Sequence, residues 1–279
     1  MQSAITVSLV PEARLGPFVY HVGPSDSAGL EDACQQASQL GFDAIEIFPP
    51  HADVFSELDV ASLLARNRLR LAAVGTGAGW LCQQLSLTSS DPATRKRAKT
   101  FIKQIIDAAG HFGAPAIIGS MQGRAATAGE RESSLDLLGQ ALVELAHYAG
   151  QRHSVPLLVE PLNRYETNLL NQVGETGAWI GSLATDNLQI LADFFHMNIE
   201  EADMAVALTA AGGLVGHVHF ADSNRRAVGL GHSPIASALA ALRRMDYRGY
   251  LSAEIFPLPD CNVAARATID SFQQLTASR

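Results

Sequence analysis

Eight short apolar runs recur along the chain, and helical periodicity fills most of the intervals between them. The runs cover residues 5–10, 44–48, 70–76, 115–120, 156–160, 188–193, 214–220 and 250–256. They lack the polar–apolar alternation of a half-exposed strand. Strands of this kind, each followed by a helix, are typical of a parallel sheet whose outer face is covered by helices. The pattern therefore predicts a series of βα units.

Two of the intervals show helix start and stop signals. Residues 91–113 begin with Asp91-Pro92, an N-cap residue followed by proline at the first helical position, and they close on Gly113. Residues 232–250 repeat the arrangement, with a basic last turn before a glycine and the next apolar run. We predict a helix in each interval.

Eight such units in a chain of 279 residues match the dimensions of a closed (β/α)8 barrel. A doubly wound open sheet is the alternative, but no Gly-x-Gly-x-x-Gly motif follows the first run. The nearest sequence, GTGAG at 75–79, follows the third run and is a weak signal alone. Because no low-complexity linker interrupts the chain, we predict one domain, a single (β/α)8 TIM barrel over residues 1–279.

Charge and cysteine content restrict the partners and the compartment. The chain has 20 basic and 28 acidic residues, and a net charge of −8 does not attract nucleic acid or anionic lipid. The three cysteines, Cys34, Cys82 and Cys261, form no C-x-x-C motif, which fits a reducing compartment. No signal peptide is recognisable, and no window approaches the roughly 18 apolar residues of a membrane span. We expect a cytoplasmic protein without nucleic-acid or membrane partners.

Four successive runs end in residues that can bind a metal ion: Glu160, Asp193, His219 and Glu254. In a (β/α)8 barrel the C-terminal ends of the strands meet at one rim. Converging carboxylates repel each other and are driven to protonate unless a cation lies between them. The pattern therefore predicts a divalent metal site, although each carboxylate taken singly could be a helix cap or a salt-bridge partner.

An oxygen-rich site with one imidazole favours octahedral Mn²⁺, Mg²⁺ or Co²⁺ over closed tetrahedral zinc. Two coordination positions would stay open for neighbouring oxygens of a substrate. His217 lies two residues before His219 on the same strand face, and we assign it as a hydrogen-bonded core histidine. Glu46 is kept outside the ligand set, as a structural acid or as one that supports a ligand from behind. Glu200 and Glu201 are predicted to cap the helix that follows them.

Several long motifs resemble the xylose-isomerase-like barrel of sugar isomerases and epimerases. They are VGTGAGWL (74–81), IIGSMQGR (117–124), VEPLNRYETNLLN (159–171), ADFFHMNIEEAD (192–203), HVHFADSNRRAVGLGH (217–232) and AEIFPLPD (253–260). The resemblance is greatest to the D-tagatose/D-psicose 3-epimerases and the related 5-keto-L-gluconate epimerases. The chain departs from the family pattern at Phe194, where a threonine is usual, and in the loop after Arg225, where the change alters the substrate contacts that the resemblance implies.

The resemblance implies that the metal ligands fall on the same four strand-end residues, with Mn²⁺ as the preferred ion. It implies substrate contacts at Glu166, His196 and Arg225, each a few residues after a ligand. Members of this family invert a carbinol centre beside a ketone through an enediolate, and Glu160 and Glu254 would be the acid/base pair. Relatives are commonly dimers or tetramers, so we expect a homo-oligomer.

We therefore expect a metal-dependent epimerase acting on a free ketose or keto-sugar acid. An aldose–ketose isomerase, including the hydroxypyruvate isomerase type, uses the same enediolate and stays open. The net charge and the single-ion ligand set disfavour an abasic-site endonuclease on the same barrel, and a non-catalytic sugar-binding barrel would not need both glutamates.

Arg124, which follows the fourth run, is either a solvated loop cation or a clamp for a substrate carboxylate. A clamp would favour a keto-sugar acid over a neutral ketose. An unphosphorylated substrate is preferred, because no glycine-rich phosphate loop with a nearby lysine occurs.

Overall fold

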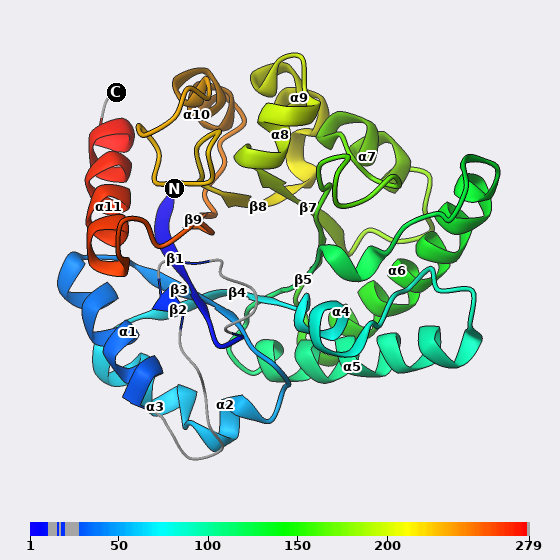
Figure 1. Cartoon of the computed structure of the whole chain (residues 1–279), viewed down its shortest axis with the longest axis horizontal. Coiled ribbons are helices and arrows are strands. Elements are labelled where there is room, and N and C mark those ends of the chain that lie inside the picture. The colour runs from blue at the N-terminus through cyan, green and yellow to red at the C-terminus, as the bar shows by residue number, and fades with distance from the viewer. Residues whose placement is uncertain (11–15, 17, 20–27, 278–279) are drawn as a thin grey trace.

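The computed structural model describes residues 1–10, 16, 18–19 and 28–277. The described strands form one parallel sheet in the order β2-β1-β3-β4-β5-β6-β7-β8-β9, and pairing of β1 with β9 closes eight of them into a barrel (Figure 1). Their bounds are β1 (Gln2–Ser8), β2 (Phe18–Val19), β3 (Ala44–Phe48), β4 (Arg70–Gly75), β5 (Ala116–Ile118), β6 (Leu157–Val159), β7 (Leu188–Asp193), β8 (Val215–His219) and β9 (Tyr250–Ala253). The predicted (β/α)8 barrel is confirmed.

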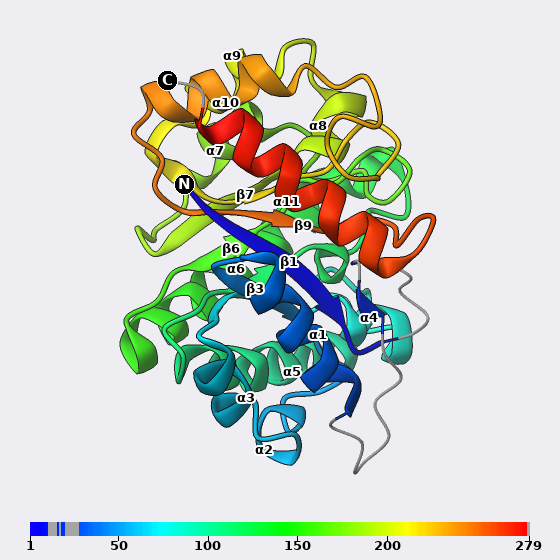
Figure 2. The same ribbon diagram turned by 90° about the vertical axis from the view of Figure 1, so that its left-hand side faces the viewer.

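Helices surround the barrel on its outside, as the side view shows for α1 and α11 next to β1 (Figure 2). The α-helices are α1 (Ala28–Leu40), α2 (Val54–Glu57), α3 (Val60–Asn67), α4 (Ala78–Gln83), α5 (Pro92–Gly110), α6 (Arg131–His153), α7 (Val173–Ile180), α8 (Phe194–Glu200), α9 (Met204–Ala211), α10 (Ile235–Arg244) and α11 (Cys261–Ala277). Short 3₁₀ turns are η2 (Ser120–Gln122), η3 (Ala128–Glu130) and η4 (Gly212–Leu214). Among the described residues, no helix has the length and apolar character needed to cross a membrane.

Each predicted apolar run overlaps a strand, and two of them, 44–48 and 188–193, coincide with β3 and β7. The strands β5, β6 and β9 are shorter than predicted. Glu160 and Glu254 therefore lie one residue beyond β6 and β9, where the chain leaves the sheet. The strand β2 was not predicted. It pairs with the end of β1 at Val7 and Ser8, beyond the stretch that pairs with β9.

The predicted start of α5 is confirmed and its predicted end is wrong. The Asp91 carboxylate accepts hydrogen bonds from the backbone N–H groups of Ala93 (3.1 Å) and Thr94 (2.9 Å). The helix ends at Gly110 rather than Gly113. Gly113 has a φ of 67°, a left-handed conformation that glycine adopts without steric cost, so it belongs to the turn before β5.

The predicted capping role of the glutamate pair is also wrong. The next helix, α9, is capped by Asp203, whose Oδ1 accepts from the N–H groups of Ala205 and Val206. Glu200 instead accepts hydrogen bonds from Arg164, and Glu201 accepts one from the backbone of α7. Neither carboxylate therefore caps α9: Glu200 binds Arg164 in the segment after β6, and Glu201 binds the first residue of α7.

The strand alternation decides which side chains reach the barrel interior, because residues two apart lie on the same face. Four buried side chains from β4, β5, β6 and β7 form a small cluster of their own: Ala73, Ile117, Leu158 and Leu191. Glu160 and Asp193 each follow a member of this cluster by two residues. Both carboxylates are therefore directed toward the barrel axis at its C-terminal end.

Candidate metal centre

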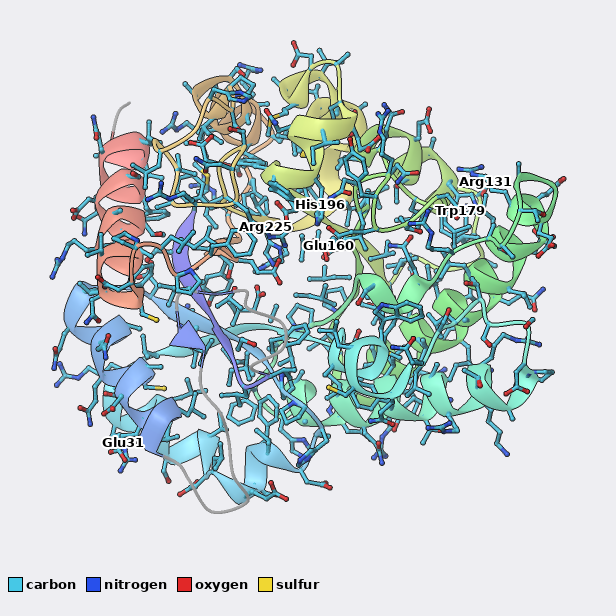
Figure 3. The ribbon with its side chains drawn as sticks, viewed as in Figure 1. Glu31, Arg131, Glu160, Trp179, His196 and Arg225 are labelled. Carbon is cyan, nitrogen blue, oxygen red and sulfur yellow. The ribbon has the colours of Figure 1, made fainter. Side chains whose placement is uncertain are left out.

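The four predicted ligands converge at the C-terminal mouth of the barrel. Glu160, Asp193, His219 and Glu254 are all buried, and each offers a ligand atom that lies within 4.8 Å of the other three. His219 Nδ1 stands 3.5 Å from Glu160 Oε1, 3.4 Å from an Asp193 oxygen and 3.5 Å from a Glu254 oxygen. Figure 3 shows Glu160 at the centre of the barrel together with His196 and Arg225.

Three of the converging atoms are buried without a hydrogen-bond partner in the described part of the chain: Glu160 Oε1, Asp193 Oδ2 and His219 Nδ1. A buried polar atom without a partner is costly, so native proteins pair nearly all of them. These three face one another across a few ångströms. Three carboxylates and one imidazole are also the donor set that oxygen-preferring divalent cations take. The residues therefore fit a single divalent metal ion.

The carboxylates in this cluster have displaced pKa values. Burial raises the pKa of Glu160 to about 8, against the opposing influence of His219. Burial also acts on Asp193, but the nearby His196 and His219 hold its pKa well below the ordinary value. Asp193 thus stays ionised while the neighbouring Glu160 takes up a proton near neutral pH. Crowded carboxylates titrate in this way when no cation lies between them.

Asp193 combines the ordinary structural role with the candidate ligand role. Its Oδ1 accepts a hydrogen bond from the backbone N–H of Phe195 at 2.7 Å, which caps the start of α8. Its Oδ2 is the unpartnered oxygen that faces His219. The helix cap thus fixes the side chain so that the second oxygen points into the cluster.

Glu46 and His217 have the structural positions that the sequence predicted. Glu46 Oε2 accepts a hydrogen bond from His217 Nε2 at 2.8 Å, and Oε1 accepts one from His219 Nε2 at 3.1 Å. Burial raises the pKa of Glu46, but His219 and His217 together bring it below its ordinary value. His217 is therefore a hydrogen-bonded core histidine, and Glu46 lies behind the candidate ligand His219.

Of the predicted substrate residues, His196 and Glu166 lie beside the cluster and share one partner. The side-chain amide of Asn163 donates to His196 Nδ1 at 2.8 Å and to Glu166 Oε1 at 3.0 Å. His196 Nε2 lies 3.8 Å from Glu160 Oε1. Burial lowers the pKa of His196 to about 3 and raises that of Glu166. His196 is therefore a neutral imidazole directed at the cluster.

Arg225 lies nearer the candidate ligands than expected. Its guanidinium is buried, forms an ion pair with Glu254 and lies 3.6 Å from Asp193 Oδ2. It also stacks over the ring of Phe195, 4.7 Å from the centroid. The family resemblance implied a substrate contact for Arg225. In the structure it contacts the carboxylates themselves.

A cavity of about 430 Å³ opens above the cluster. Arg124 lines it, is exposed, and donates from Nη1 to the backbone carbonyl of Tyr165 at 3.0 Å. Within the residues that the structure describes, no carboxylate forms a salt bridge with Arg124, whereas Arg225 is paired. Aromatic side chains, among them Trp80 and Tyr165, also line the cavity. The wall thus combines apolar surface with a cation that has no carboxylate partner among the described residues, as small-molecule pockets commonly do.

Comparison with known proteins identifies the protein family of this chain. Residues 34–275 match the xylose isomerase-like TIM barrel family, which covers most of the chain. The chain belongs to this family. The resemblance inferred from the motifs is thereby confirmed.

The relatives are sugar epimerases. L-ribulose 3-epimerase of Methylomonas sp. (strain DH-1) is 32% identical over 241 residues, covering 84% of this chain and 81% of that protein. D-psicose 3-epimerase of Agrobacterium fabrum is 28% identical over 252 residues, covering 88% and 80%. Among solved structures, D-allulose 3-epimerase from Methylomonas sp. matches with a TM-score of 0.80 at 26% identity, over 98% of both chains. These matches confirm that the protein is an isomerase, and they support a sugar epimerase acting next to a ketone.

Two site residues of this family member were missed in the sequence. Gly119 follows β5 on the interior face, and a Cβ atom there would lie 2.6 Å from Glu160 Oε2. The sequence did contain a hint of this role. In the motif IIGSMQGR, Gly119 follows the inward-facing Ile117 by two residues and so lies on the same face. Asn163, which holds His196 and Glu166, follows Glu160 by three residues in a loop motif. Its amide gave no chemical signal until the fold placed the two partners on either side of it.

Proposed function

We propose that the protein is a divalent-metal-dependent epimerase that inverts the carbinol centre next to the ketone of a free ketose or keto-sugar acid. The observation that carries the proposal is the convergence of three unpartnered buried atoms from Glu160, Asp193 and His219, with Glu254 beside them. Structural relatives determined with sugars support the substrate class, since D-allulose 3-epimerase from Methylomonas sp. was solved in complex with D-allulose.

Glu160, Asp193, His219 and Glu254 would hold the ion, with Mn²⁺ preferred and Mg²⁺ or Co²⁺ as alternatives. When bound, the ion would polarise the ketone and stabilise the negative charge that develops as the neighbouring C–H proton leaves. Its ligand shell would leave positions for substrate oxygens, because the chain contributes four groups to the site.

Glu160 and Glu254 are the acid/base pair in this proposal. Inversion requires proton removal on one face of the carbon and delivery on the other. The two residues follow β6 and β9, which are separated in the barrel by β7 and β8, so their carboxylates approach the cluster from different sides. One glutamate would take the proton, giving an enediolate, and the other would return a proton to the opposite face.

The neighbouring side chains would orient the substrate. His196 is buried and neutral, so its Nε2 can hydrogen-bond a hydroxyl without adding charge. Glu166 is half-exposed at the cavity and can accept from another hydroxyl. Arg225 would hold Glu254 in place through their ion pair. Arg124, at the cavity wall, would bind a substrate carboxylate, which favours a keto-sugar acid.

Turnover in D₂O tests this function. The protein is incubated with Mn²⁺ and, in separate reactions, D-fructose, D-tagatose or a 5-keto-gluconate. We expect a C3-epimer, or its equivalent for the keto acid, carrying deuterium at the inverted carbon. An aldose product with deuterium at C2, or recovered ketose with deuterium at C1, would instead indicate an aldose–ketose isomerase. Absence of any product from all three substrates, with Mn²⁺ and again with Mg²⁺ or Co²⁺ in its place, would contradict the proposal.

A further inference from the structure

Glu46 lies behind His219, on the side of the imidazole opposite the carboxylate cluster. It comes from β3, which is separated from β8 in the closed sheet by β9 and β1. Its carboxylate therefore reaches across the barrel interior, where it is 2% exposed. The Oε1 atom stands 3.1 Å from His219 Nε2, while His219 Nδ1 faces Asp193 Oδ2 at 3.4 Å. The two ring nitrogens of one histidine thus have separate partners.

We propose that Glu46 is a positioning residue for the metal centre: it accepts the Nε2–H of His219 and so fixes the ring with Nδ1 directed at the ion. The inference rests on the proposed function, because it assumes that His219 is a metal ligand. A carboxylate can only accept, so the proton of this hydrogen bond belongs to the imidazole. Partners of this kind fix the tautomer and orientation of a metal-binding histidine.

The Glu46 carboxylate is itself held from two further directions. His217 Nε2 donates to Oε2 at 2.8 Å, and Thr6 Oγ1 donates to Oε1 at 3.3 Å. The rings of His217 and His219 stand edge to face, 5.8 Å apart at 82°. Both oxygens are thus engaged, so the carboxylate does not turn to join the ligand set. The His-x-His spacing on β8 then has a simple explanation: His219 faces the ion and His217 secures its partner.

Glu46→Gln tests the proposal with little change of shape. An amide replaces one of the two acceptor oxygens by an NH₂ donor, so one of the two histidines loses the acceptor it now faces. We expect Mn²⁺ binding to weaken about 10- to 100-fold. The Kd is measured on the metal-free protein from the paramagnetic resonance signal of free Mn²⁺, and circular dichroism checks the fold. Thr6→Val is the matched control, since it removes the longest of the three hydrogen bonds and should change the Kd by less than about threefold.

A second measurement needs no variant. In wild-type protein labelled with ¹⁵N-histidine and loaded with diamagnetic Mg²⁺, His219 should carry a slowly exchanging proton on Nε2. A proton on Nδ1 would overturn the proposal, as would a folded Glu46→Gln protein with wild-type Mn²⁺ affinity. Two Mn²⁺ ions per chain would overturn it as well, because Glu46, His217 and His219 would then hold an ion themselves. If wild-type protein binds no Mn²⁺, the proposed metal site itself is wrong.

Discussion

The guanidinium of Arg225 forms a buried ion pair with the carboxylate of Glu254, in the cluster that also contains Asp193 and His219. Arg225 is in a left-handed backbone conformation, with a φ of 54°, and its carbonyl accepts from the N–H of Phe256. The loop after β8 is therefore tied to the chain after β9. Such strained residues persist where surrounding contacts over-determine them, often at functional sites.

Replacing Arg225 should destabilise the protein more than most surface changes do. In Arg225→Leu, Glu254 is left buried without its partner, and loss of one member of a buried pair costs about 3–5 kcal/mol. Arg225→Lys keeps the charge and should lose less. Urea denaturation of the metal-free proteins gives the comparison. Arg248→Leu is the control, since Arg248 pairs with Asp246 on the exposed surface and its loss should change stability little. Equal effects of both leucine substitutions would contradict the buried role.

Substitution of the two candidate proton-transfer residues should leave deuterium exchange in different epimers. Glu160→Gln and Glu254→Gln should each lower the epimerisation rate by about 10²–10⁴-fold, the usual contribution of a general acid or base. Each variant retains one carboxylate, which can still remove a proton from one epimer and return deuterium to the same face. Mass spectrometry in D₂O should therefore show exchange without inversion, in one epimer for Glu160→Gln and in the other for Glu254→Gln. Exchange into the same epimer in both variants would contradict the pairing.

The strand-end residues were predictable because one face of a strand repeats every two residues, and parallel strands end at one rim. That rule needs no neighbour information, so it was enough to place Glu160 and Asp193 at this rim. The role of Arg225 depends on which carboxylate lies opposite its loop, and only the closed barrel decides this. The end of α5 was misplaced for a related reason: Gly113 is a stop signal, but the glycine belongs to the turn and the last helical residue is Gly110.

Any side chain at position 119, in place of the hydrogen of Gly119, should lower the activity. A Cβ atom would lie 2.6 Å from Glu160 Oε2, and the carboxylate end is the part that can move aside. We expect Gly119→Ala to fold but to lose at least about tenfold in kcat, because small displacements of reacting groups are costly. Gly129→Ala is the matched control in the 3₁₀ turn η3 after the same strand, where a Cβ would have its nearest neighbour, Thr127 Oγ1, at 3.9 Å. Activity of Gly119→Ala equal to that of the control would refute this close packing.

Arg124 should discriminate between substrate types. Removing a guanidinium that hydrogen-bonds a carboxylate costs about 1.5–3 kcal/mol, or roughly 10- to 150-fold in kcat/KM. We expect Arg124→Ala to show this loss with a keto-sugar acid, with little change for a neutral ketose. Arg124→Lys should recover part of the loss, since it restores the charge without the fork geometry. A similar effect on both substrate types would return Arg124 to the role of a loop cation.

The metal-free protein should lose stability as the pH rises from about 6.5 to 8.5, and a bound divalent ion should remove that loss. Burial raises the pKa of Glu160 to about 8, so the folded chain holds a proton that the unfolded chain releases near pH 4. For His219, burial lowers the pKa, but Glu46 and Glu254 raise it well above its ordinary value, so it too binds its proton more tightly when folded. Stability falls with pH wherever the folded state binds more protons.

Below pH 6.5 the trend should flatten, because His196 acts in the opposite direction. Burial lowers its pKa to about 3, so the unfolded chain binds the extra proton there and stability rises with pH. Each proton is worth about 1.4 kcal/mol per pH unit over its window. Urea denaturation of chelator-treated protein at pH 5.5, 6.5, 7.5 and 8.5, with and without Mg²⁺, measures the effect. If the free energy of unfolding of the metal-free protein rises between pH 6.5 and 8.5, Glu160 and His219 do not share a crowded site of the kind that a cation would stabilise.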